Sequence, residues 1–156
     1  MNTVLIRRGT IRDAERISAL ITALSEAYIV GEFAAEGREH FLRDHTPSAV
    51  HERLAGDFRF YLAESREELA AVAAIRSNAH LYYLFVGAPF HRMGLARRLW
   101  AKVREDSLAL GNPGTFTVNA SNYAVPAYER LGFRRTEPTR EKNGVLYNPM
   151  RFTRAG

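Results

Sequence analysis

The segment HRMGLARRLWAKVREDSLAL, residues 91–110, joins a short loop to a long amphipathic stretch. Because Gly111 is a typical helix stop, we expect a helix over residues 94–110, with one apolar face made of Leu95, Leu99, Val103 and Leu110. The first amides of such a helix have no intrahelical partner, and the helix dipole adds positive potential there. Gly94 and Ala96 carry almost no side chain, so a pyrophosphate could reach the main chain. The segment therefore predicts a site for a phosphate-rich ligand, with more positive charge at its mouth from Arg92, Arg97 and Arg98.

Apolar patterns on both sides of this segment predict the remaining elements. Strands are expected at 4–8, 59–63, 69–75, 79–86, 115–119, 133–136 and 145–152. Helices are expected from Thr10 to Tyr28, from Thr46-Pro47, over 94–110 and over 126–131, and a short helix within 32–45 is left open. This order indicates an α/β fold, with a mostly antiparallel mixed sheet of about six or seven strands and helices on both faces. We expect a single domain over residues 1–156.

The composition excludes several kinds of chemistry. The chain has no cysteine, which rules out disulfides, thiolate metal sites and cysteine nucleophiles. Its histidines lack the spacing of a helical zinc pair, so no metal is expected. The first apolar run is too short for a signal peptide, and no stretch is long enough to span a membrane. We therefore expect a cytoplasmic protein without a membrane partner.

The formal net charge is +5, and nearly all of the basic residues are arginine. A solvated surface, a nucleic acid and a polyanionic cofactor would each account for this charge. The basic residues are scattered and no nucleic-acid-binding motif is visible, which argues against nucleic acid as a partner. A polyanionic cofactor fits the loop at Gly94 better.

A second motif lies downstream, in the run AVPAYERLGF at residues 124–133. Together with residues 86–96 and the helix and strand between them, it resembles the GNAT superfamily of acyl-CoA-dependent N-acetyltransferases. The family loop pattern is Gln/Arg-x-x-Gly-x-Gly/Ala, which Gly94 and Ala96 match, whereas His91 departs from its first position. The Tyr-x-x-x-Gly-Phe pattern is intact from Tyr128 to Phe133. Ser121 stands where the family often has Asn.

The resemblance implies acetyl-CoA as co-substrate. Its pyrophosphate would lie on the amides of the loop and helix start, and its pantetheine arm would pair with the strand before the loop as an added strand. The implied cofactor-binding residues are Leu84, Phe85, Val86, His91, Arg92, Met93, Gly94, Leu95, Ala96 and Arg97, with Asn119, Ser121 and Asn122 as alternatives in the second motif. Whether His91 contacts the cofactor through its side chain or only its backbone is left open.

Tyr128 is the candidate catalytic residue. Attack of an amine on a thioester forms a tetrahedral oxyanion and then expels a thiolate, to which a nearby phenol can donate a proton. Main-chain N–H groups near Phe85 or Val86 could stabilise the oxyanion. On its own Tyr128 would be interpreted as a core aromatic, but the two motifs together favour the catalytic interpretation. The base that deprotonates the amine remains open among His80, Tyr82, Tyr83, Glu26, Glu39 and ordered water.

The sequence predicts direct acetyl transfer to a primary amine of a small molecule or peptide. A non-catalytic acyl-CoA-binding module or sensor is the alternative. Acidic residues gather in the segment expected to wall the acceptor site, and they are either a solvated helix face or an attraction for a cationic amine: Glu26, Glu32, Glu36, Glu39 and Asp44. The oligomeric state is open, and a homodimer is one alternative.

Overall fold

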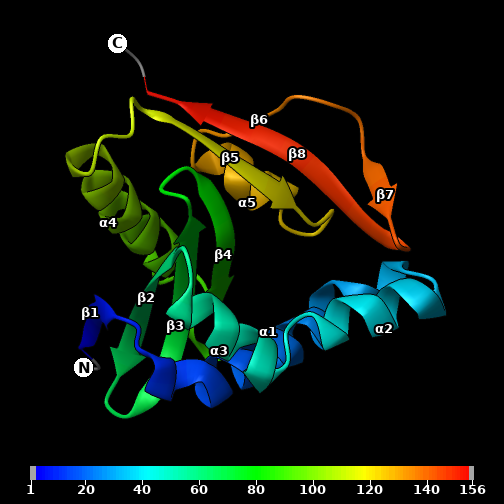
Figure 1. Ribbon diagram of the computed structural model, residues 1–156, viewed down its shortest axis with the longest axis horizontal. Helices are drawn as coiled ribbons and strands as arrows, with labels where there is room; N and C mark the ends of the chain where they lie inside the picture. The colour runs from blue at the N-terminus through cyan, green and yellow to red at the C-terminus, as the bar shows by residue number, and fades with distance from the viewer. Residues whose placement is uncertain (1–2, 155–156) are drawn as a thin grey trace.

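The computed structural model describes residues 3–154, so both ends of the expected domain lie outside the described residues. Over the described range, eight strands form a mixed sheet in the order β1-β2-β3-β4-β5-β8-β6, with β7 paired to β8 (Figure 1). Every pairing is antiparallel except that of β4 with β5. The strands are β1 (Val4–Arg8), β2 (Phe58–Ser65), β3 (Glu68–Arg76), β4 (His80–Val86), β5 (Thr115–Ala120), β6 (Arg134–Arg135), β7 (Arg140–Lys142) and β8 (Val145–Thr153).

Helices cover both faces of the sheet. They are α1 (Ala14–Tyr28), α2 (Ala35–Arg43), α3 (Pro47–Ala55), α4 (Leu95–Ala109) and α5 (Val125–Arg130), with short 3-10 turns at Ile11–Asp13, Val30–Glu32 and Ala88–Phe90. On one face α1 and α3 bury Ile17, Ile21 and Val50 against β2, β3 and β4. On the other face α4 and α5 bury Trp100 and Tyr128 against β3, β4 and β5. The expected layered α/β architecture is confirmed.

The elements follow the sequence patterns that predicted them, with two additions. The region left open at 32–45 contains α2, and β7 extends the sheet beyond the expected strands. All three residues of β7 are charged or polar and exposed, so the strand has no apolar alternation by which it could be recognised. The helix expected from Thr10 begins as a 3-10 turn, in which Asp13 accepts a hydrogen bond from the Thr10 amide at 2.8 Å.

An irregularity in β4 corrects one expectation about its faces. Strict alternation would place His80 and Tyr82 on one face and Tyr83 on the other. In the structure Leu81 pairs with Ile75 and Tyr83 with Ala74, so Tyr82 is an extra residue in a β-bulge. Tyr82 and Tyr83 consequently pack against the same hydrophobic cluster, with their ring centroids 4.9 Å apart.

Candidate active site

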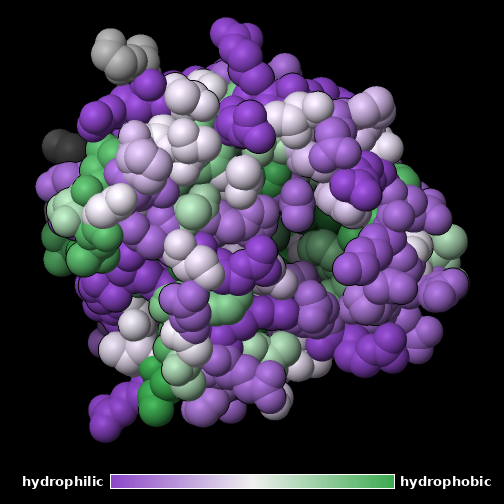
Figure 2. All heavy atoms as spheres, turned by 45° about the horizontal axis from the view of Figure 1, so that its top comes forward, coloured by the Kyte–Doolittle hydropathy of each residue, from purple (hydrophilic) through white to green (hydrophobic). Residues whose placement is uncertain are grey.

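The candidate site is a cleft that opens where β4 and β5 separate. The two strands pair only through His80 with Thr117 and Leu81 with Val118, and they then splay apart (Figure 1). Within the described chain, the rest of β4 up to Val86 has no strand partner on the β5 side. The cleft has a volume of about 1110 Å³, and in Figure 2 it is a hollow with an apolar floor and a hydrophilic rim.

The start of α4 presents free backbone amides to one end of this cleft. Gly94 is the N-cap, with φ of +74°, a conformation in which a residue with a side chain is strained. No side chain of the described residues caps α4, and the first helical bond runs from the Arg98 amide to the Gly94 carbonyl. The three amides before Arg98 therefore lack a helical acceptor. Three arginines line the same end: Arg92, Arg97 and Arg130. This end is suited to an anion.

Most of the residues predicted to hold the cofactor line this cleft: Leu84, Phe85, Val86, His91, Arg92, Gly94, Leu95, Ala96, Arg97, Asn119 and Ser121. Met93 and Asn122 lie outside the lining. Met93 is 46% exposed on the outer side of the loop. The Asn122 side chain donates to Glu32 at 2.7 Å and accepts from Asn148 at 2.8 Å, so its polar atoms are already engaged. Of the three alternatives in the second motif, only Asn119 and Ser121 reach the cleft.

The His91 side chain turns back toward β4. Its Nε2 lies 2.8 Å from the carbonyl oxygen of Val86, which it can reach only as a donor. Its ring also lies 6.1 Å from that of Tyr28 at the end of α1. His91 therefore occupies the backbone acceptor that an added strand would use at Val86, and it must turn away before such a strand can pair there.

The position of Tyr128 is compatible with both interpretations of the sequence, a core aromatic and a catalytic residue. Its ring belongs to the main core, is 7% exposed and packs edge-on against Phe133 with the centroids 5.4 Å apart. It also lines the cleft. No described residue hydrogen-bonds to its hydroxyl, and burial raises the pKa of the phenol well above its usual value. Tyr128 is therefore protonated at neutral pH, and its proton is not committed to another group among residues 3–154.

A buried polar network closes the other end of the cleft. Arg53 donates to the Tyr83 hydroxyl at 2.6 Å, and that hydroxyl lies 2.8 Å from Nδ1 of His45. The Tyr83 proton therefore goes to Nδ1, which leaves the proton of His45 on Nε2. Burial, and next the charge of Arg53, lower the pKa of His45 to about 4. His45 is thus a neutral donor in the wall of the cleft rather than a positive charge.

Two further groups on β4 line the same end. The Nδ1 of His80 lies 2.8 Å from Oγ1 of Thr117, and burial together with Arg76 lowers the pKa of His80 to about 4. The Tyr82 ring lies between two guanidinium groups, with Arg53 at 4.9 Å and Arg76 at 5.6 Å from its centroid. Glu26 and Glu39, the other candidate bases, are absent from the cleft lining.

The acidic segment contributes less to this cleft than its sequence indicated. Of its five carboxylates only Asp44 lines the cleft, and it is bound to Arg53 at 3.0 Å. Glu32 accepts the hydrogen bond from Asn122 instead. The expectation that this segment attracts a cationic amine therefore rests on one carboxylate that already has a cationic partner.

Sequence reasoning missed the aromatic residues at the mouth of the cleft. Tyr28 at the end of α1 stacks on Tyr123, which follows β5, with the ring centroids 4.9 Å apart. Both rings line the cleft and both are exposed. They are 95 positions apart in the chain, so no local pattern relates them.

The family model described as Acetyltransferase (GNAT) domain matches residues 29–154, which is more than half of the chain. The chain belongs to the GNAT acetyltransferase family. No curated relative matches the sequence. Among solved structures, a GCN5-related N-acetyltransferase from Rhodopseudomonas palustris has a TM-score of 0.82 at 19% identity, with 98% of this chain and 97% of that chain covered. The PaiA N-acetyltransferase from Thermoplasma acidophilum, solved in complex with coenzyme A, has a TM-score of 0.79 at 14% identity, with 97% and 99% covered. These likenesses show the GNAT fold.

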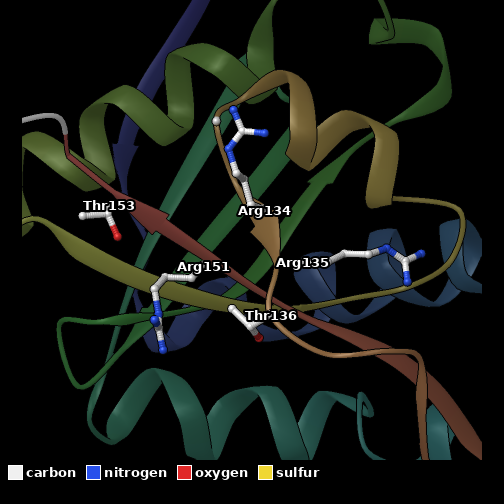
Figure 3. Close-up of a pocket in the computed structure, with 6 residues that line it drawn as sticks. Arg134, Arg135, Thr136, Arg151 and Thr153 are labelled. Atoms are coloured by element: carbon white, nitrogen blue, oxygen red, sulfur yellow. The ribbon is translucent and has the colours of Figure 1, made fainter.

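A second hollow of this GNAT protein is less suited to a charged ligand. A smaller hollow of about 240 Å³ lies along β6 and β8 and is lined by Arg134, Arg135, Thr136, Arg151 and Thr153 together with Gly132. Figure 3 shows Arg134 and Arg151 pointing in opposite directions, so their charges do not converge on one ligand. Among residues 3–154 no group of three or more metal-ligating side chains occurs. Nor is any helix in that range long and apolar enough to cross a membrane.

Proposed function

We propose that this protein is a single-domain N-acetyltransferase, which transfers an acetyl group from acetyl-CoA to a primary amine by direct attack in a ternary complex. One observation carries the proposal. The uncapped start of α4, the unpaired part of β4 and Tyr128 all line one cleft. The start of α4 would bind an anion, the unpaired part of β4 would pair with an amide-bearing arm, and Tyr128 would donate a proton.

The cofactor fits along the splayed strands. Its pyrophosphate would accept hydrogen bonds from the amides of Leu95 to Arg97, assisted by Arg92 and Arg130. Its pantetheine arm would pair with residues 84–86 of β4, once His91 has released the carbonyl of Val86. The acetyl group would then lie between β4 and β5. The PaiA structure, which is bound to coenzyme A, supports this choice of ligand class.

The chemistry needs two proton transfers. The neutral amine attacks the thioester carbon and forms a tetrahedral oxyanion, for which the N–H groups near Phe85 and Val86 serve as donors. The attacking nitrogen is positively charged after this step and gives one proton to a base. The oxyanion then collapses and breaks the carbon–sulfur bond. Tyr128 donates its proton to the leaving thiolate and recovers a proton from solvent afterwards. The raised pKa of its phenol keeps Tyr128 in the protonated form that this step requires.

The base is His80 or an ordered water. A base must have a free lone pair at working pH, and the low pKa of His80 keeps its imidazole neutral. The same low pKa makes His80 a weak base, which favours the ordered water. Tyr83 is a poor base because burial raises the pKa of its phenol and its proton already bonds His45. Burial also raises the pKa of Tyr82, which leaves it protonated.

Release of free thiol from acetyl-CoA, measured with a panel of primary amines, tests the proposal. Amine-dependent thiol release that saturates in both substrates is expected. The alternative is an acyl-CoA-binding module without turnover, and calorimetry separates the two. Micromolar binding of acetyl-CoA with no amine-dependent release across the panel would establish the binding module and refute the transferase.

A further inference from the structure

The half of the cleft beyond Tyr82 has an apolar floor. Ile29 and Phe33, which follow α1, pack against Phe41 of α2 and against Val145 and Leu146 of β8. These five residues belong to one cluster and all of them line the cleft. An acceptor that fills this half therefore buries an apolar body.

Two cations stand in this half of the cleft without an acidic partner. Arg76 at the end of β3 and Lys142 of β7 both line it, and no described carboxylate lies within ion-pair distance of either. Arg76 is held over the Tyr82 ring at 5.6 Å. Asp44 is the acidic residue of the lining, and its charge is offset by Arg53 at 3.0 Å. The local excess of charge is therefore positive.

The positive charge in this half of the cleft is separate from the positive charge proposed to bind the cofactor. Arg76 pairs with His80, which is the first residue of β4. The loop that leads to α4 follows Val86, which is the last residue of β4. Six residue steps along a strand span about 20 Å. The phosphate end of the cleft also has its own arginines, Arg92, Arg97 and Arg130. Arg76 and Lys142 therefore act on whatever occupies the acceptor half.

We propose that the acceptor is an apolar amino acid, whose side chain lies on the floor formed by Phe33 and Phe41 and whose carboxylate is bound by Arg76, while Lys142 adds to the positive potential of this half. This inference rests on the proposed acetyltransferase function and names its substrate class. It opposes the interpretation, left open by the acidic segment, that the site attracts cationic amines. Carboxylates complement a positively charged site electrostatically, whereas polyamines are repelled by it.

Matched acceptor pairs test the inference. Thiol release from acetyl-CoA is measured with phenylalanine against phenylalaninamide, with leucine against leucinamide, and with spermidine. The amide has the more acidic ammonium group and thus more free amine, so intrinsic reactivity favours the amide. A kcat/KM at least about tenfold higher for the acids is expected, which corresponds to one charge-assisted hydrogen bond. Equal or higher kcat/KM for the amides or spermidine would overturn the inference and leave the acetyltransferase function standing.

Substitutions of Arg76 and Lys142 test which side chain causes the preference for a carboxylate. Arg76→Gln should raise KM for phenylalanine about tenfold and leave KM for acetyl-CoA and for phenylalaninamide unchanged. Arg76→Lys keeps the charge and should recover most of the loss, and Lys142→Gln should act in the same direction as Arg76→Gln. Arg12→Gln removes an exposed arginine outside the cleft and is the matched control. An unchanged KM for phenylalanine in Arg76→Gln would refute the assigned carboxylate site. Absence of thiol release with every amine would instead refute the proposed function, and this inference with it.

Discussion

Replacing Tyr128 with Phe removes one oxygen from the cleft and keeps the aromatic ring that packs on Phe133. The lost hydroxyl has no hydrogen-bond partner among the described residues, so no buried group is left unpaired. The free energy of unfolding should therefore change by less than about 1 kcal/mol. Turnover should fall by about 10² to 10⁴, the usual contribution of a general acid. That loss corresponds to about 3–5 kcal/mol of transition-state stabilisation.

The measurement is thiol release at saturating acetyl-CoA, together with calorimetric affinity for acetyl-CoA and the midpoint of urea unfolding. Affinity and midpoint should match those of the parent protein while kcat falls. Tyr123→Phe is the matched control, because it removes a phenol hydroxyl from an exposed ring of the same cleft and should leave kcat within about twofold. Full turnover in Tyr128→Phe would return Tyr128 to a purely structural role and refute the proton-donor argument.

Three other perturbations address the loop before α4, the buried polar network and the contact of α2 with the turn between β7 and β8. Gly94→Glu puts a carboxylate and a side chain where φ is +74°, so affinity for acetyl-CoA should fall at least about tenfold in a folded protein, and calorimetry with unchanged affinity would dismiss the loop as the anion site. Because burial lowers the pKa of His45 from 6.5 to about 4, the unfolded chain takes up the proton first as pH falls. His45 should thus contribute about 3 kcal/mol to the decline in the free energy of unfolding between pH 6.5 and pH 4, in addition to the decline from His80 in the same range. Urea titrations should show a flatter profile for His45→Gln, and equal profiles would exclude His45 as a source. A Cβ at Gly37 would collide with the carbonyl of Gly144, so Gly37→Ala should lower the free energy of unfolding by about 1–3 kcal/mol, whereas Gly31→Ala meets nothing within 4 Å and is the control in thermal unfolding.

Much of the fold could be predicted from the sequence because its periodic elements are also its buried ones. The apolar face of α4, from Leu95 to Val103, is almost wholly buried against the sheet, and the β-prone run of β4 is central to the sheet. Leu110, which was expected on the same face, lies beyond the last residue of α4 and is exposed. The exposed β7 could not be predicted, because edge pairing to β8 leaves no apolar pattern in Arg140–Lys142.

The candidate site also has one part that follows from the sequence and one part that does not. The half proposed for the cofactor follows from one continuous stretch, residues 84–97, which turns from strand to helix and supplies most of that half of the lining. The acceptor half could not be predicted, because it is assembled from α1, α2, β3 and β7, which meet only in the folded chain. The bulge at Tyr82 changed which side chains share a face, and the pairing of Asp44 with Arg53 reversed the local charge balance.

Mass spectrometry of both protein and acceptor tests the central claim most directly. The protein is first incubated with acetyl-CoA alone, and the amine panel is then added. Direct transfer predicts an unchanged protein mass throughout, and acetylated amine in amounts equal to the free thiol released after the amine is added. An acetylated protein before amine addition, or bound acetyl-CoA that never yields acetylated amine, would contradict the account.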